Sequence, residues 1–188
     1  MGNTIAGVEQ DEVVLSVECV EPKGAIVRHV RRCYLSFEKL RTLYDRLGQF
    51  EVLFNNQHGG DFKAFVSNFI AQTGPDTFEP TGLFWEVDDV GILYLTNIKP
   101  GYEATAHFSF WDRRYRGREE LLKEMIRYNF EKLQLHRLVA EVPLFAPALL
   151  SFTEKLGFVK EGRRRQTTWY KNQWFDSNIY SILRSEVF

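Results

Sequence analysis

The chain has 188 residues, a length that fits one compact domain, and its hydrophobic share of 44% and charged share of 26% are those of an ordinary globular protein. A formal net charge of -1 excludes an overall attraction to nucleic acid, and no stretch approaches the roughly 18 apolar residues of a membrane span. The polar start lacks the basic and apolar regions of a signal peptide, and Cys19 and Cys33 have no disulfide or metal spacing, so we expect a cytoplasmic protein.

The segment before residue 80 is expected to form a strand hairpin followed by two helices. Val13–Val20 and Ala25–Val30 alternate apolar and polar residues on either side of a turn, which is typical of a β-hairpin. Ser36 can cap a helix with one apolar face, and Asp61 can cap a second helix whose apolar stripe runs through Ile70. This segment therefore mixes both kinds of secondary structure.

From Thr81 onward, strand patterns dominate. The expected strands of a three-strand meander are Gly82–Val87, Val90–Asn97 and Tyr102–Phe110. An amphipathic helix, Arg118–Leu133, then leads to the short apolar strand Arg137–Val142. A strand–helix–strand crossover makes its two strands parallel when they share a sheet, so we expect one parallel pair.

A last helix and two strands complete the chain. Pro147 suits a first helical position, and Gly157 suits the end of the helix that it opens. The strands Arg165–Tyr170 and Trp174–Leu183 follow, joined by a short turn. No repeat, low-complexity tract or linker interrupts the pattern, so we expect a single domain over 1–188.

The most informative segment is Phe108–Glu119, where a strand runs through a basic, glycine-containing loop into a helix. Free N–H groups and the positive end of the helix dipole make such a junction a site for phosphate. Four arginines add positive charge to it: Arg113, Arg114, Arg116 and Arg118. The segment predicts an anion-binding cradle, and the alternative is a merely solvated loop.

Several ordered motifs resemble a known family. Arg114-x-x-Gly117-x-Glu119 resembles the Q/R-x-x-G-x-G/A acetyl-CoA motif of the GNAT superfamily. Leu135–Val142, Glu154–Gly162 and Tyr170–Arg184 resemble the second half of that family, closest to its ribosomal-protein N-terminal acetyltransferase branch. The agreement extends over roughly residues 80 to 185. It implies a mixed α/β, three-layer αβα fold with a mostly antiparallel central sheet and one splayed parallel strand pair.

The resemblance also implies where acetyl-CoA, the co-substrate, would bind. The pantetheine arm would pair with the exposed backbone of His107–Phe110, and the pyrophosphate would lie on the N–H groups of Arg114–Glu119. A backbone N–H of that strand would polarise the thioester carbonyl. The implied cofactor-binding residues are Phe108, Ser109, Phe110, Arg114, Tyr115, Arg116, Gly117, Arg118 and Glu119. No metal is implied.

Direct attack by an amine needs a base for the ammonium and an acid for the departing thiolate. Glu103 and His107 are the candidate bases, because residues four apart on a strand project from the same face, here toward the thioester end. Glu141 is a further candidate. Thr153 stands where relatives carry a tyrosine acid, and its hydroxyl is a poor proton donor that a water could replace. The other histidines show no metal-ligand spacing: His29, His58 and His136.

Departures from the family pattern keep two functions open. Glu119 places a carboxylate where diphosphate should lie, and Ala146 and Leu149 replace an asparagine and a serine that relatives carry. The first hypothesis is an acetyl-CoA-dependent N-acetyltransferase acting on a protein N-terminus, a lysine or a small amine. The second is a catalytically inactive GNAT-fold module that binds or assembles, for example within a larger particle.

Partners are less determined by the sequence. Acceptor pockets in this family come from the first helices and late loops, here Arg31–Gln72 and Lys171–Ser177. Four aromatic residues could line that pocket, fill the core or meet a second subunit in a homodimer: Trp169, Tyr170, Trp174 and Phe175. Nucleic-acid binding through Arg113–Arg118 and Arg163–Arg165 is a third hypothesis, against which the balanced charge argues.

Overall fold

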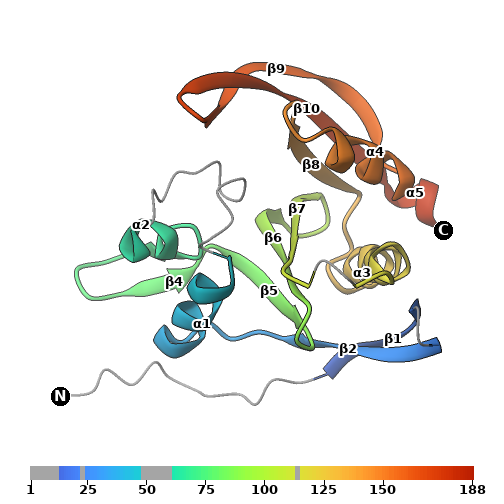
Figure 1. The fold of residues 1–188 in the computed structure, drawn as a ribbon, viewed down its shortest axis with the longest axis horizontal. Helices are drawn as coiled ribbons and strands as arrows, with labels where there is room; N and C mark the ends of the chain where they lie inside the picture. The colour runs from blue at the N-terminus through green and yellow to red at the C-terminus, as the bar shows by residue number, and fades with distance from the viewer. Residues whose placement is uncertain (1–12, 22–23, 48–60, 113–114) are drawn as a thin grey trace.

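A large mixed sheet forms the centre of the molecule (Figure 1). The computed structural model describes residues 13–21, 24–47, 61–112 and 115–188. The eight strands of the sheet have the order β1-β2-β5-β6-β7-β8-β10-β9. They are β1 (Val13–Glu21), β2 (Gly24–Arg32), β5 (Gly82–Val87), β6 (Gly91–Lys99), β7 (Glu103–Phe110), β8 (Arg137–Pro143), β9 (Val159–Tyr170) and β10 (Gln173–Leu183).

Helices cover both faces of this sheet. They are α1 (Phe37–Leu47), α2 (Phe62–Val66), α3 (Arg118–Lys132), α4 (Pro147–Lys155) and α5 (Arg184–Val187). Alternate residues of β5 and β6 point to opposite faces of the sheet, and each face has its own hydrophobic core. Phe84 and Ile92 belong to the core with α1 and α2, whereas Trp85 and Leu93 belong to the core with α3. The predicted three-layer fold is therefore confirmed.

The sheet is antiparallel except for one pair. Strands β7 and β8 are parallel, as the crossover through α3 predicts, and their register pairs run only from Glu103 with Arg137 to Thr105 with Val139. Beyond Thr105, β7 stays paired with β6 as far as Phe110, while β8 stays paired with β10. Figure 1 shows β8 turning away from β7. The two strands thus separate into the expected splay.

The second helix is shorter than its apolar stripe predicts. Asp61 caps it as expected, accepting a hydrogen bond from the Lys63 N–H at 2.8 Å, but the helix ends at Val66. Ile70 instead begins strand β3 (Ile70–Gln72), which pairs with β4 (Phe78–Pro80) in a separate two-stranded sheet. Phe69, which lies between α2 and β3, is fully buried. The stripe predicts burial correctly and helix length incorrectly, because buried positions also occur where the chain turns.

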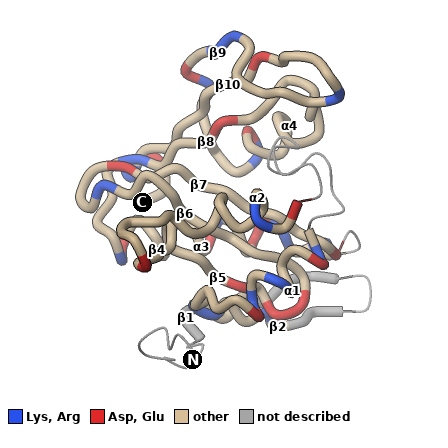
Figure 2. Tube along the Cα trace, turned by 90° about the vertical axis from the view of Figure 1, so that its left-hand side faces the viewer, with Lys and Arg blue, Asp and Glu red and all other residues tan. Residues whose placement is uncertain are grey.

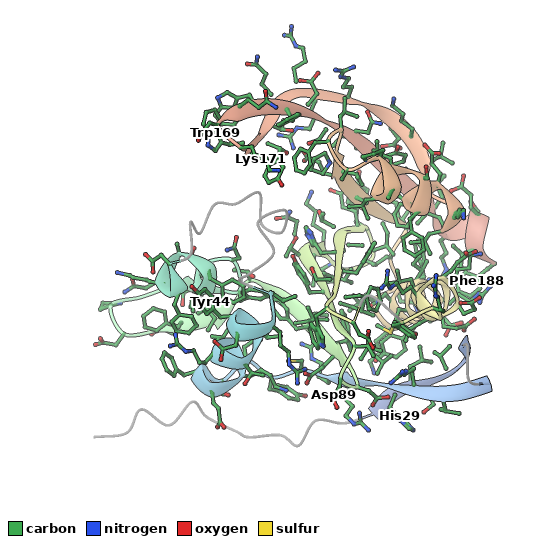
Figure 3. All side chains as sticks on the ribbon, viewed as in Figure 1. His29, Tyr44, Asp89, Trp169, Lys171 and Phe188 are labelled. Carbon is green, nitrogen blue, oxygen red and sulfur yellow. The ribbon has the colours of Figure 1, made fainter. Side chains whose placement is uncertain are left out.

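The C-terminal hairpin is longer than predicted, and it projects from the rest of the sheet (Figure 1). Gly157, at φ 95°, ends α4 as expected, and β9 begins only two residues later. Lys171 and Asn172 form the tip with φ values of 47° and 59°, which is typical of a two-residue hairpin turn. Figure 3 shows Trp169 and Lys171 at this tip.

Candidate active site

The separation of β7 and β8 creates an opening in the sheet, with a cavity of about 140 Å³. Its lining comes from β7, β8, the turn before α4, α4 itself and one residue of β6: Tyr94, Ala106, His107, Phe108, Ser109, Ala140, Glu141, Val142, Pro143, Phe145, Ala146, Leu149 and Thr153. The backbone of residues 106–110 has no register partner on β8. This opening is where an extended ligand could lie along the strand edge.

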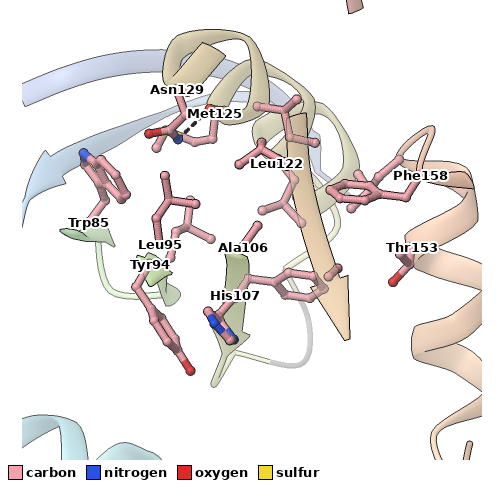
Figure 4. A pocket seen from close by; sticks show the side chains of 16 residues that line it. Trp85, Tyr94, Leu95, Ala106, His107, Leu122, Met125, Asn129, Thr153 and Phe158 are labelled. Atoms are coloured by element: carbon pink, nitrogen blue, oxygen red, sulfur yellow. Dashed lines mark hydrogen bonds between the residues drawn. The ribbon is translucent and has the colours of Figure 1, made fainter. Parts of the chain in front are cut away.

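Two further cavities adjoin the opening on opposite faces of the sheet. The cavity on the α2 side is polar and is lined by Asn68, Tyr94, Thr96, His107, Glu141, Pro143, Arg164, Thr167, Thr168 and Ser177. The cavity beneath α3 and α4 is mostly apolar (Figure 4). Tyr94 and His107 line all three spaces. A ligand in the opening can therefore be reached from both faces.

His107 stands at the junction of these cavities in a neutral state. Its Nε2 lies 2.9 Å from the Thr96 hydroxyl oxygen, and its ring is stacked on that of Tyr94. Burial lowers the pKa of His107 to about 4. The imidazole is therefore uncharged near neutral pH, with one ring nitrogen as donor and the other as acceptor. It can orient an amine, but it is a weak base.

Tyr94 is a site residue that the sequence did not single out. Burial raises the pKa of Tyr94 above its usual range, so the hydroxyl keeps its proton. Phe84 stacks on one side of the ring and His107 on the other, and Figure 4 shows the Tyr94 and His107 rings side by side. In the sequence, Tyr94 is a tyrosine among the apolar residues of β6. That pattern is typical of an ordinary core residue and does not indicate a site.

Glu103 does not join this group, which corrects the expectation that it points toward the thioester end. Its carboxylate pairs with Lys99 at 2.7 Å, and its backbone is in register with Arg137 at the closed end of the splay. Four residues of strand separate it from His107 by about 13 Å. A shared face does not bring the two side chains together.

Glu141 is the carboxylate that the fold brings to His107. It lines both the opening and the polar cavity, although the sequence named it only as a further candidate. Its Oε2 accepts a hydrogen bond from Nη1 of Arg164 at 2.6 Å. Glu141 lines the same cavities as His107 because β8 and β7 are neighbouring strands. Spacing along one strand cannot reveal that relationship.

Thr153 lies in the expected place but with its proton engaged. The side chain is buried and lines the opening from α4. Its hydroxyl donates to the Leu149 carbonyl at 2.8 Å, a common helix back-bond. Thr153 therefore shapes the cavity, and Tyr94 is another hydroxyl-bearing residue of the lining.

The segment expected to form an anion cradle leads into the start of α3. Gly117 is the N-cap residue and supplies no side-chain hydrogen bond to the first turn. Tyr115 is buried, and its hydroxyl donates to the Gly117 carbonyl at 2.8 Å, which fixes the entry to the helix. Arg118 donates to the Asp112 carbonyl at 2.9 Å, and Arg116 is exposed. Arg114 lies outside the described residues.

Glu119 is less of an obstacle than the sequence suggests. Its carboxylate pairs with Lys123, one turn along the helix, at 2.7 Å, and the lysine lowers the pKa of the glutamate. The negative charge of Glu119 is thus matched within α3.

The three residues of β7 implied in cofactor binding differ in placement. Ser109 is buried beside the opening, while the rings of Phe108 and Phe110 pack on each other, and Phe108 also packs on Phe152. Phe108 and Ser109 also line the opening.

The four late aromatic residues divide into two pairs. Trp169 and Trp174 are exposed and pack edge to face with centroids 5.2 Å apart. Tyr170 and Phe175 instead pack on Phe145, which lines the opening. None of the four lines the three cavities directly, so they support the site only through Phe145.

The basic run on β9 is largely neutralised by ion pairs. Arg163 pairs with Asp176 and Arg164 with Glu141, both at 2.6 Å. Figure 2 shows charges of both signs interspersed along β9 and β10.

Among the described residues, no group of three or more His, Cys, Asp or Glu could hold a metal ion. None of the helices in the described part of the chain is long and apolar enough to cross a membrane.

Comparison with known proteins identifies the class. Residues 83–179, more than half of the chain, match the family described as an acetyltransferase (GNAT) domain. The chain belongs to this acetyltransferase family. It is 30% identical over 111 residues to a probable N-acetyltransferase, YjcK, of Bacillus subtilis (strain 168). That match covers 56% of this chain and 61% of the curated relative, which is less than two thirds of its length.

Solved structures share the fold at low sequence identity. A mutant of spermidine N-acetyltransferase SpeG from Vibrio cholerae is 17% identical with a TM-score of 0.65, over 86% of this chain and 96% of that one. A GNAT-family acetyltransferase from Bacillus anthracis is 14% identical with a TM-score of 0.62, over 91% and 99%. These comparisons support an N-acetyltransferase and do not support the ribosomal-protein branch that the motifs suggested.

Proposed function

We propose that the chain is an acetyl-CoA-dependent N-acetyltransferase that transfers an acetyl group to a primary amine by direct attack. The observation that carries this proposal is the opening between β7 and β8, whose pairing stops at Thr105 and Val139. It leaves the backbone of residues 106–110 without a partner on β8, in the strand that leads to the uncapped first turn of α3. One edge thus offers hydrogen bonds to a pantetheine arm and, beyond it, a site for diphosphate.

The reaction needs a free amine beside the thioester carbonyl. The amine nitrogen forms a bond to the acetyl carbon, the carbon–sulfur bond breaks, and the proton lost by the amine ends on the departing thiolate. His107, being neutral, accepts a hydrogen bond from the amine and orients it, and Glu141 takes up the proton. Tyr94, which also lines the opening, gives its hydroxyl proton to the departing thiolate and recovers one from Glu141, so the net proton transfer is from the amine to the thiolate.

The acceptor enters from the polar cavity in this proposal. Among the described residues that line it, the one carboxylate is Glu141, which Arg164 already neutralises. A polyamine such as spermidine, for which the structural neighbour SpeG is named, would bring additional positive charge to a cavity without surplus negative charge. We therefore propose an acceptor with a single primary amine, either a small molecule or a protein N-terminus.

The test is saturable acetyl-CoA binding, followed by thiol release when single amines are added. The inactive-module hypothesis predicts no thiol release with any acceptor. Absence of acetyl-CoA binding at millimolar concentration would overturn the transferase proposal. A cytoplasmic setting and a homodimer remain predictions from the sequence.

A further inference from the structure

The apolar cavity beneath α3 and α4 is a chamber with its own walls (Figure 4). Its volume is about 60 Å³, and it is lined by Trp85, Leu93, Tyr94, Leu95, Ala106, His107, Phe108, Leu122, Met125, Ile126, Asn129, Leu138, Ala140, Thr153, Leu156 and Phe158. Protein interiors rarely leave voids larger than a water molecule, and an empty apolar void lowers stability. A chamber of this kind at a candidate active site therefore points to an occupant.

The chamber is continuous with the opening between β7 and β8. Six residues line both spaces: Tyr94, Ala106, His107, Phe108, Ala140 and Thr153. Ala106 and Ala140 directly follow the last register pair, Thr105 with Val139, so two of the smallest apolar side chains line both spaces just where the strands separate. A group attached to a thioester in the opening has a direct path into the chamber.

The side chains that line the chamber indicate what kind of group it can hold. Leu93, Leu95 and Leu138 of the sheet and Met125 and Ile126 of α3 offer only hydrocarbon and thioether surface. The polar exceptions at the inner end are buried: Trp85 Nε1 and Asn129 Oδ1 have no hydrogen-bond partner within the described chain. Neither carries a charge, so the chamber suits an alkyl chain.

We propose that this chamber receives the alkyl chain of the acyl donor, so that the enzyme transfers propionyl and butyryl groups as well as acetyl. The inference rests on the proposed function, because the thioester must lie in the opening. The bonds made and broken are those of acetyl transfer: nitrogen bonds to the acyl carbon, the carbon–sulfur bond breaks, and the amine proton ends on the thiolate. Each methylene moved from water into such a chamber is expected to tighten donor binding about fourfold.

The test compares acetyl-, propionyl- and butyryl-CoA, first by direct binding and then by thiol release with one amine acceptor. We expect butyryl-CoA to bind more tightly than acetyl-CoA. Leu95→Phe, which narrows the chamber, should lower the butyryl-to-acetyl ratio of kcat/KM about tenfold. Met125→Ala, which widens it, should shift the preference toward chains longer than butyryl.

A matched control keeps stability separate from selectivity. Leu121 is fully buried on the same helix but does not line the chamber, so Leu121→Ala creates a void elsewhere and should leave the donor ratio unchanged. Thermal unfolding of all three variants identifies any that fail to fold. If a variant fails, the binding of acetyl-, propionyl- and butyryl-CoA to the wild-type protein still tests the proposal.

The two proposals fail differently. If acetyl-CoA binds and reacts while butyryl-CoA neither binds nor competes, the chamber proposal is wrong and the transferase proposal stands. If no acyl-CoA binds, the transferase proposal fails and the chamber proposal fails with it. Equal effects of Leu95→Phe on both donors would also overturn the chamber proposal.

Discussion

The imidazole of His107 lies flat against the phenol of Tyr94, with ring centroids 4.5 Å apart and an interplanar angle of 8°. The two residues are in register on the antiparallel strands β6 and β7, so the sheet itself fixes the pair. Phe84 stacks on the far side of Tyr94 at 5.5 Å. The pair therefore places a neutral acceptor and a protonated phenol in the lining of the opening, on a rigid support.

Removing the Tyr94 hydroxyl is expected to slow transfer without loosening the ring stack. Tyr94→Phe keeps the ring contacts with His107 and Phe84, while the hydroxyl proposed as the proton donor is lost. We expect kcat to fall roughly 100-fold, within the range of a lost general acid. Acetyl-CoA binding by calorimetry should change little. Tyr44→Phe on α1 is the control, because Tyr44 lines none of the three cavities; an equal loss of activity in both variants would contradict the role of Tyr94.

Stability should fall as the pH drops from about 6.5 to about 4, because of His107. Burial lowers the pKa of His107 from 6.5 to about 4, so between these values the unfolded chain binds a proton that the folded chain does not. The free energy of unfolding should lose about 3 kcal/mol over this interval from this group. Urea unfolding across the interval measures it.

A variant separates His107 from other titrating groups. His107→Phe should remove most of this pH dependence, while His136→Phe, at an exposed position, should retain it. The same low pKa means that His107 does not titrate between pH 6 and 8, so activity there should follow the fraction of free amine. A pH profile that His107→Phe alters between pH 6 and 8 would contradict this assignment.

Most of the fold could be predicted because its local signals agree with its tertiary structure. The α3 helix and β5 begin at the predicted residues, and the crossover rule gives the parallel pair of β7 and β8. The helix α2 was predicted too long, since Phe69 and Ile70 continue an apolar stripe after the helix has ended. Periodicity reports which residues are buried, and the backbone hydrogen bonds decide the element.

The candidate site was predictable where it depends on one segment and not where it joins several. The splay between β7 and β8 is what the family resemblance implied, and the anion cradle at α3, expected from the strand–loop–helix segment 108–119, stays a prediction. The exchange of Glu103 for Glu141, and the appearance of Tyr94, depend on which strands are neighbours and on where the splay begins. No spacing along one strand contains that information.

The cradle at α3 predicts a selective loss of cofactor binding. Gly117→Leu places a side chain at the N-cap of the helix, where diphosphate would lie against backbone N–H groups. We expect the dissociation constant for acetyl-CoA to rise at least about tenfold, or about 1.4 kcal/mol. Gly162→Leu on β9 is the control, since a Cβ there meets nothing within 4 Å. Unchanged acetyl-CoA binding in Gly117→Leu would place the diphosphate elsewhere.

The Glu141–Arg164 pair is expected to set acceptor charge preference. Arg164→Gln frees the Glu141 carboxylate from its partner at 2.6 Å and adds net negative charge to the polar cavity. The ratio of kcat/KM for spermidine over a monoamine should therefore rise, by roughly fivefold if one ion pair near the surface is replaced by a substrate contact of about 1 kcal/mol. Arg163→Gln, whose partner is Asp176, should leave this ratio unchanged.

The carboxylate itself is tested by a matched pair of substitutions. Glu141→Gln should lower kcat/KM for every amine, about 100-fold where Glu141 takes up the amine proton, because the amide cannot accept it. Glu103→Gln removes a carboxylate of the neighbouring strand that pairs with Lys99, outside the three cavities, and should leave turnover near wild type. Turnover with several monoamines distinguishes the two positions. If Glu103→Gln proves the slower variant, the closed end of the splay would have to communicate with the opening along β7, and the assignment of Glu141 would be wrong.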